Sequence, residues 1–191
     1  LFEEYPDMFI TGENAVQNIY SQAYHVRNNI NLPFKSNLPS PNDFVLQTAI
    51  NDALNQNFDW GKGFNRIYQV LSMDALYQNP DLNMTFVDNH DQDRYFSVIG
   101  EDLNKYKLGL GFLLTTRGTP HLYYGTEVLM KGISNPDGWV RLDFPGGWAG
   151  DKKNTFTQEG LTPAEIDMLS FTKKLGQFRK SSTAITKGKM M

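Results

Sequence analysis

One stretch of the sequence places an imidazole and two carboxylates directly after an apolar run. Its residues are Phe86-Val87-Asp88-Asn89-His90-Asp91. Burying this much polarity costs several kcal/mol unless the groups are paired, so the concentration of polar groups needs an explanation. Acid–base or hydroxyl-binding chemistry would provide one. An Asn and an Asp at a strand end also serve as helix caps, so a purely structural role stays open on the pattern alone.

Two further stretches end in carboxylates. The first reads Phe9-Ile10-Thr11-Gly12-Glu13, and the second runs from Arg117 to Glu127 and contains Tyr123 and Tyr124. Each has an ordinary interpretation by itself. The glutamate of the first stretch would be an exposed loop residue, and the second stretch would be a strand with a proline near its start.

Short apolar runs predict the strands that would position these residues. The runs are Met8–Thr11, Phe44–Thr48, Met84–Val87 and His121–Tyr124. None alternates cleanly between apolar and polar residues, which favours parallel strands that are covered on both faces. Each run ends in polar or turn residues, so the candidate side chains would share one edge of the sheet.

Helices are predicted between and after these strands. Apolar residues recur at three- and four-residue spacing in Ile67–Leu76 and Tyr106–Thr115. A last helix should begin after Thr162, where Glu165 completes a capping box, and should end near Arg179.

The chain is therefore expected to form four consecutive βα units, the α/β pattern of half an eight-unit barrel with about 31 residues per unit. A small doubly wound sheet is the alternative, but no Gly-rich phosphate loop follows a predicted strand. Lys131–Gln158 is predicted to be a long loop after the fourth strand, and Thr183–Met191 resembles the start of a further strand. The predicted domains are residues 1–182, half a barrel, and residues 183–191, the start of a C-terminal β domain.

Bulk properties restrict the possible partners. The chain has 191 residues, 40% of them hydrophobic, and a formal net charge of −3, so no basic field favours a nucleic acid. No apolar run reaches the roughly 18 residues of a membrane span. The chain has no cysteine, which excludes disulfides and thiolate metal sites.

The stretch Val87-Asp88-Asn89-His90-Asp91 resembles the V-x-N-H-D motif of the α-amylase family of glycoside hydrolases. This resemblance implies that His90 and Asp91 bind hydroxyls of the sugar at the cleavage point. The motif lies at the end of the seventh strand of a TIM (β/α)8 barrel in that family.

The other stretches are similar to motifs of the same family in the same order. Phe9–Glu13 resembles the fifth-strand motif, which makes Glu13 the general acid/base. Arg117–Glu127 resembles the eighth-strand motif G-x-P-x-x-Y-Y-G-x-E. Asp143–Trp148 and Asn154–Phe156 look most like neopullulanases, cyclomaltodextrinases and outer-membrane-associated starch-utilisation amylases of bacteria.

The resemblance implies the second half of a catalytic barrel, strands five to eight with their helices, from a retaining enzyme that cleaves α-1,4 or α-1,6 bonds. The substrates would be starch-type glucans, maltooligosaccharides or cyclodextrins. The implied catalytic residues are Glu13 and Asp91. The implied substrate-binding residues are Asn89, His90, Tyr124 and Trp148.

The sequence departs from the family in one respect. The nucleophilic aspartate belongs to a G-x-R-x-D motif on the fourth strand, and no such motif occurs in these residues. The chain alone is therefore expected to be inactive, because removing a covalent nucleophile costs many orders of magnitude in rate. Half a barrel would also leave sheet edges unpaired and should self-associate.

Alternatives stay open at this point. The same covalent intermediate also supports transglycosylation or a sucrose- or trehalose-type isomerisation, and a non-catalytic sugar-binding relative would keep the fold. No cofactor is expected to be required and no metal ligand is predicted, although Asp and Asn residues within residues 135–151 would suit calcium. The resemblance implies a periplasmic, secreted or cell-envelope location in a bacterium, with any signal peptide outside this chain.

Overall fold

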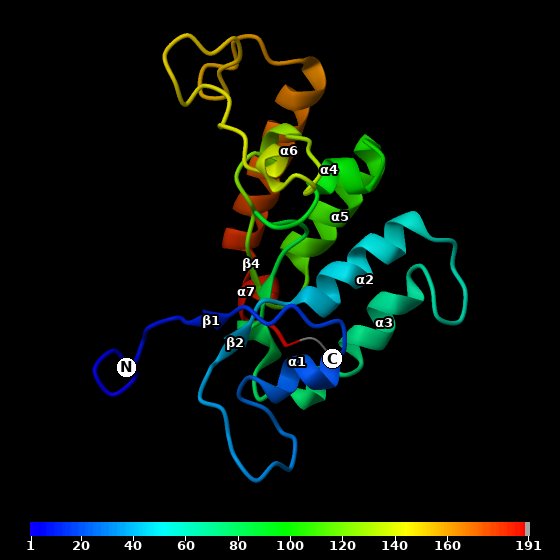
Figure 1. Cartoon of the computed structure of the whole chain (residues 1–191), viewed down its shortest axis with the longest axis vertical. Coiled ribbons are helices and arrows are strands. Elements are labelled where there is room, and N and C mark those ends of the chain that lie inside the picture. Colours follow the sequence, from blue (N-terminus) through cyan, green and yellow to red (C-terminus); the bar gives the residue numbers. More distant parts are fainter. Residues whose placement is uncertain (190–191) are drawn as a thin grey trace. The chain divides into compact units, whose positions relative to one another are not determined.

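A computed structural model describes residues 1–189 (Figure 1). The chain divides into two compact units. Unit 1 consists of Leu1–Phe86 with Arg117–His121, and unit 2 consists of Val87–Thr116 with Leu122–Met191. No helix among residues 1–189 is both long enough and apolar enough to cross a membrane. Residues 190 and 191, the end of the strand predicted at Thr183–Met191, lie outside the described part of the chain.

Unit 1 contains four short parallel strands. β1 (Thr11–Gly12) pairs with β2 (Ser40–Pro41), and β3 (Met84–Thr85) pairs with β4 (Thr119–Pro120). A parallel bridge between Asn42 and Met84 joins the two pairs, so the strands follow one another in chain order. This is the order that consecutive βα units produce. The strands among residues 1–189 do not close into a barrel.

The strand prediction was right in number and wrong in part of its placement. Phe44–Thr48 was wrong, because these residues begin helix α2 (Phe44–Asn55) and the strand is β2, just before it. Asp43 caps this helix by accepting a hydrogen bond from the Leu46 N–H at 3.0 Å. A short apolar run does not distinguish a strand from the buried start of a helix, and here the capping aspartate decides.

The other three strands are shorter than predicted or displaced. Met8–Ile10 lie outside any strand, and Phe9 is 48% exposed rather than covered. The predicted run at His121–Tyr124 follows β4 instead of forming it. Its first residue still continues the pairing, because the His121 N–H donates to the Thr85 carbonyl at 2.7 Å.

The remaining helices and 3-10 turns of unit 1 lie between its strands in the sequence. They are α1 (Ile19–Tyr24), α3 (Asn65–Leu71), η1 (Asp74–Leu76) and η2 (Pro80–Leu82). α2 packs beside α3 (Figure 1). α2 contributes one part of the core of the unit, where the Phe44 ring meets the Phe86 ring edge-on at 5.0 Å between centroids. A second buried cluster consists of Ala23, Val26, Ile30 and Tyr77. The helix predicted at Ile67–Leu76 is thus α3 followed by η1.

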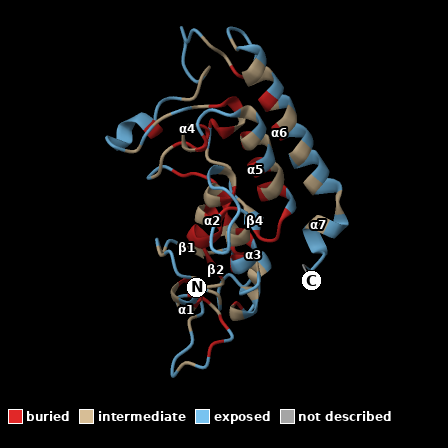
Figure 2. Ribbon diagram, turned by 90° about the vertical axis from the view of Figure 1, so that its right-hand side faces the viewer, coloured by how far each residue is buried: buried red, intermediate tan, exposed pale blue. Residues whose placement is uncertain are grey.

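Unit 2 is built from helices and loops. Its elements are α4 (Tyr95–Val98), α5 (Leu103–Thr115), η3 (Thr126–Val128), η4 (Asp137–Val140), α6 (Pro163–Ser181) and α7 (Thr183–Lys187). α5 and α6 pack together, with Leu110 and Met168 both fully buried. The outer side of α6 is exposed along its length (Figure 2). α5 confirms the helix predicted at Tyr106–Thr115 and begins earlier, because Asp102 caps it.

The last helix confirms the prediction closely, and the tail contradicts it. α6 begins after Thr162 with the expected capping box to Glu165. The strand predicted at Thr183–Met191 is wrong for the described part of that tail, because Thr183–Lys187 is the helix α7, capped by Ser182. Lys131–Gln158 is the expected long loop, interrupted only by the single turn of η4.

Candidate active site

Glu13 lies directly after β1 in unit 1. Its side chain is exposed, at the carboxyl end of the strand. The strand beneath it is held by parallel pairing to β2 and by a hydrogen bond of 2.8 Å from the Thr11 hydroxyl to the Asn42 side chain. Glu13 is therefore presented at the end where parallel βα sheets carry their functional groups.

Asn89, His90 and Asp91 form one cluster in unit 2. The Asp91 N–H donates to the side-chain oxygen of Asn89 at 3.0 Å, and His90 Nε2 lies 3.3 Å from Asp91 Oδ2. Asn89 is 8% exposed, whereas half of the Asp91 side chain is exposed. The cluster thus has a buried amide that fixes the turn, and a carboxylate and an imidazole that are exposed to solvent.

Asp88 lies beneath this cluster and is almost fully buried. Its carboxylate accepts hydrogen bonds from the Tyr95 N–H at 2.8 Å and from the Thr126 hydroxyl at 3.1 Å. Burial raises the pKa of Asp88 to about 6, although these hydrogen bonds and the nearby Arg94 charge oppose the rise. Asp88 therefore joins the motif to α4 and η3 and is a structural residue, which separates it from the exposed Asp91.

Tyr123 and Tyr124 lie against a buried arginine, and their rings meet edge-to-face. Their rings meet at 4.6 Å between centroids, and the guanidinium carbon of Arg94 lies 4.1 Å from the Tyr123 centroid and 4.7 Å from that of Tyr124. Arg94 is completely buried and donates to the Tyr124 carbonyl. Burial and the neighbouring Tyr124 raise the pKa of Tyr123 to about 12, so its hydroxyl stays protonated and can donate. Tyr124 is 38% exposed.

Trp148 is placed in the long loop of unit 2 and is 67% exposed. Its backbone N–H donates to Asp151 Oδ2 at 3.2 Å, and that same oxygen accepts from the backbone N–H of Gly146 at 2.8 Å. These bonds fix the turn that carries the indole. They belong to the loop itself and do not connect Trp148 to the Asn89–Asp91 cluster.

Arg141 was not among the predicted site residues. Its Nη2 lies 2.7 Å from Asp91 Oδ1 and 2.9 Å from Asp137 Oδ2, and its Nε donates to the His90 carbonyl at 2.8 Å. The only sequence signal was indirect, a basic residue in the loop just before Asp143–Trp148. Arg141 and Asp91 are 50 residues apart in the sequence, so no local sequence pattern predicts that they pair.

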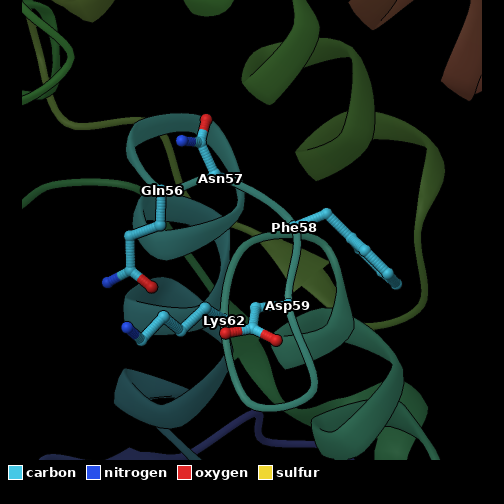
Figure 3. Close-up of a pocket in the computed structure, with 5 residues that line it drawn as sticks. All are labelled: Gln56, Asn57, Phe58, Asp59 and Lys62. Carbon is cyan, nitrogen blue, oxygen red and sulfur yellow. The ribbon is translucent and has the colours of Figure 1, made fainter.

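The surface pockets include few of the predicted site residues. A hollow of about 510 Å³ in unit 1 is lined by Gln56, Asn57, Phe58, Asp59 and Lys62 and holds none of the predicted site residues. Figure 3 shows the Phe58 ring directed away from the side on which Gln56 and Lys62 extend. Tyr124 borders a hollow of about 440 Å³ in unit 2 that is mainly apolar.

No group of three or more His, Cys, Asp or Glu side chains suited to a metal ion gathers among residues 1–189. Two acidic side chains of the long loop have other partners, since Asp151 accepts from two backbone N–H groups and Asp137 pairs with Arg141.

Comparison with known proteins gives a family. The profile described as "Alpha amylase, catalytic domain" matches residues 1–181. A cyclomaltodextrin glucanotransferase of Geobacillus stearothermophilus is 39% identical over 95 residues, which are 50% of this chain and 13% of that protein. A second, from Thermoanaerobacterium thermosulfurigenes, is 29% identical over 148 residues, covering 76% of this chain and 18% of the relative.

Solved structures agree in fold. The α-amylase of Geobacillus thermoleovorans, complexed with acarbose, superposes with a TM-score of 0.67 at 24% identity, over 95% of this chain and 35% of that one. A γ-cyclodextrin glucanotransferase from alkalophilic Bacillus clarkii gives a TM-score of 0.63 at 27% identity, over 96% and 24% of the two chains. The chain thus spans about a third or less of the length of these structures.

Proposed function

Because this chain belongs to the α-amylase catalytic-domain family, we propose that it forms the second half of the catalytic barrel of a retaining enzyme acting on α-glucans. The bonds cleaved are α-1,4 or α-1,6, in starch-type glucans, maltooligosaccharides or cyclodextrins. The observation that carries the proposal is the family match over residues 1–181, which includes all three motifs. Four parallel strands in chain order support their assignment as strands five to eight.

Glu13 is the general acid/base of the proposed reaction. It protonates the leaving oxygen and then activates the water or sugar hydroxyl that resolves the covalent intermediate. Its exposed position after β1 suits this role. Asp91 and His90 bind the hydroxyls of the sugar at the cleavage point through hydrogen bonds that strengthen in the transition state. Asn89 holds their turn, and Tyr124 supplies contact surface.

Trp148 is proposed as a stacking surface for a more distant sugar of the glucan. Its indole is largely exposed and its turn is fixed by Asp151, which limits the entropy lost on binding. An aromatic face of this kind suits the C–H face of a glucose ring.

The nucleophile of this enzyme lies outside the chain, and the chain alone is inactive. We would assay the purified 191-residue chain and the complete enzyme that contains it with maltoheptaose. The chain alone should release no product, whereas the complete enzyme should be active. Hydrolysis by the chain at the rate of the complete enzyme would refute this part of the proposal.

Glu13→Gln in the complete enzyme tests the central role. General acid catalysis contributes about 10²- to 10⁴-fold, so kcat should fall by that factor. Glu4→Gln is the matched control, because Glu4 is also an exposed glutamate of unit 1 and lies outside the motif. Equal activity of the Glu13 and Glu4 variants would remove Glu13 from the catalytic role.

Transglycosylation is the second candidate reaction, and the names of the curated relatives favour it. Several are cyclomaltodextrin glucanotransferases, and one is an α-amylase of Niallia circulans, 32% identical over 100 residues. Product analysis of the complete enzyme with maltoheptaose separates the two reactions. Cyclic or longer glucans indicate transfer to a sugar hydroxyl, and shorter linear products alone indicate hydrolysis.

Two further properties are proposed for this protein. The chain alone self-associates, because β1 and β4 each have an unpaired side among the described residues. A monomer at micromolar concentration by sedimentation would contradict this. The complete enzyme works in the periplasm, at the cell envelope or outside a bacterial cell, a location that rests on the resemblance of the motifs to bacterial members of the α-amylase family. Fractionation of cells that express it tests the location.

A further inference from the structure

Arg141 makes three contacts to the Asn89–Asp91 cluster and its surroundings. Its Nη2 reaches Asp91 Oδ1 at 2.7 Å, and its Nε donates to the His90 carbonyl at 2.8 Å. The same Nη2 lies 2.9 Å from Asp137 Oδ2. One guanidinium therefore contacts the side chain of Asp91 and the backbone carbonyl of His90.

Asp91 needs such a support. Half of its side chain is exposed, so its packing alone leaves the carboxylate free to change rotamer. His90 Nε2 is 3.3 Å from Oδ2, beyond the usual N–H···O hydrogen-bond range of about 2.7–3.2 Å. The contact of Arg141 with Oδ1 is shorter and charge-assisted, which makes it the stronger of the two restraints.

Arg141 is itself anchored on both sides by hydroxyl groups. The Tyr123 hydroxyl donates to the carbonyl of Val140 at 3.3 Å, and the Tyr124 hydroxyl donates to the carbonyl of Leu142 at 2.7 Å. Val140 is completely buried. The backbone before and after Arg141 is therefore tied to the two tyrosines, although the arginine side chain is 43% exposed.

The tyrosines are held in turn by the buried Arg94. Its guanidinium carbon lies within 4.7 Å of both ring centroids, and a cation over an aromatic face is attracted to it. A continuous series of contacts thus leads from Arg94 in the interior of unit 2, through Tyr123 and Tyr124, to Arg141 and Asp91.

We propose that Arg141 is a positioning residue that fixes the Asp91 carboxylate for transition-state binding, an inference that rests on the proposed function. The carboxylate keeps its capacity to bind sugar hydroxyls, because each oxygen accepts more than one hydrogen bond. Asp137 shares the charge of Arg141, so the group of three keeps a net negative charge. The effect on the reaction passes through Asp91, because misplacing a catalytic group by about 1 Å costs roughly 10²-fold in rate.

The test compares four variants of the complete enzyme with maltoheptaose as substrate. Arg141→Met should lower kcat by about 10- to 100-fold and change KM by less than about threefold, because the contact acts in the transition state. Arg141→Lys keeps the charge but not the fork geometry and should recover part of kcat. Lys131→Met is the matched control and should stay within about twofold of the wild type.

The control is well matched to the residue tested. Lys131 Nζ lies 2.9 Å from Glu101 Oε2, in the same unit, and both side chains are half exposed, as in the Arg141 pair. A general loss of surface ion pairing would affect both variants alike. Tyr123→Phe removes the hydroxyl that holds Val140 and should lower kcat in the same direction by a smaller factor.

The inference is overturned if Arg141→Met keeps kcat within twofold, if Lys131→Met loses as much, or if Arg141→Met is faster, which would show that Arg141 blocks Asp91. A wild-type enzyme inactive on maltoheptaose, starch and α-cyclodextrin would instead defeat the proposed function and, with it, the inference. Arg141→Lys keeps the comparison decisive if the methionine variant folds poorly.

Discussion

The two units each contain an arginine that bridges two aspartates, in opposite environments. In the buried bridge of unit 1, Arg117 lies 2.6 Å from both Asp43 and Asp74, and its side chain is 2% exposed. In the exposed bridge of unit 2, Arg141 contacts Asp91 and Asp137 with its side chain 43% exposed. The chemistry of the two groups is the same, and the solvent around them differs.

This difference separates stability from function. The buried bridge has other partners, since Asp43 also accepts from the Gln22 amide and caps α2. Burial alone would raise the pKa of Asp43, but the Arg117 charge and these hydrogen bonds outweigh it and hold the pKa below the usual value. The exposed bridge is screened by water and contributes little to folding. Its value lies in placing an open carboxylate.

Arg117→Met should break the buried bridge with the largest effect. It leaves Asp43 and Asp74 without their counter-charge, and removing one partner of a buried pair costs about 3–5 kcal/mol in the free energy of unfolding. Urea unfolding with hydrogen exchange read in α2 measures the loss. Arg66→Met is the control, because its contact with Asp52 is longer, 3.5 Å, and about a third exposed. A cost near that of the control would show that the bridge is not a folding determinant.

Asp88→Asn tests a buried aspartate that belongs to neither bridge, and its effect on stability should depend on pH. Its pKa is about 6 when folded and about 3.9 in an unfolded chain. The folded state binds a proton more tightly, so Asp88 contributes stability below about pH 4 that is lost as the pH rises through 6. The total is about 3 kcal/mol.

In the wild type, the free energy of unfolding of unit 2 should decrease between pH 4 and pH 7. In Asp88→Asn this decrease should be smaller by about 3 kcal/mol. Hydrogen exchange in α5 at several pH values reports it. Asp143→Asn, at an exposed position in the same unit, should have the same slope of unfolding free energy against pH as the wild type. An unchanged slope for Asp88→Asn would mean that the buried carboxyl does not control this pH range.

Thr162→Ala tests an exposed polar contact within a single element, the capping box of α6. The Glu165 N–H donates to the Thr162 hydroxyl at 3.3 Å, and the Thr162 N–H donates to Glu165 at 2.7 Å. Loss of such a cap costs about 1 kcal/mol. Thermal unfolding should show this loss for alanine, whereas Thr162→Ser should stay within a few tenths of the wild type. Equal values for alanine and serine would argue that the cap is not formed.

These contacts also show what the sequence could predict. The capping box of α6 depends on residues three positions apart, so a local pattern announced it. The strand at Phe44–Thr48 was misplaced because apolar runs are ambiguous at that length, and the tail after Ser182 was predicted as a strand although Ser182 caps a helix. Glu13 and Asp91 were found through motifs, and their catalytic roles stay predictions.

The two bridges could not have been predicted, because each joins residues far apart in the sequence. Arg117 and Asp43 are separated by 74 positions, and Arg141 and Asp91 by 50. An arginine in a sequence does not reveal whether it will be buried or which carboxylate it will meet. Only the folded arrangement of β4 beside β3, and of the long loop beside the Asn89–Asp91 cluster, decides the pairing.

Arg141→Met should have the smallest effect on stability, less than about 1 kcal/mol, because exposed pairs are screened and cost side-chain entropy to hold. Urea unfolding of the variant chain, with hydrogen exchange read in α5 and α6, gives the value. The same substitution is expected to lower kcat by about 10- to 100-fold, so stability and activity would separate at this position. A destabilisation as large as that of Arg117→Met would place the exposed bridge among the folding contacts of unit 2 and would leave its effect on kcat without a specific cause.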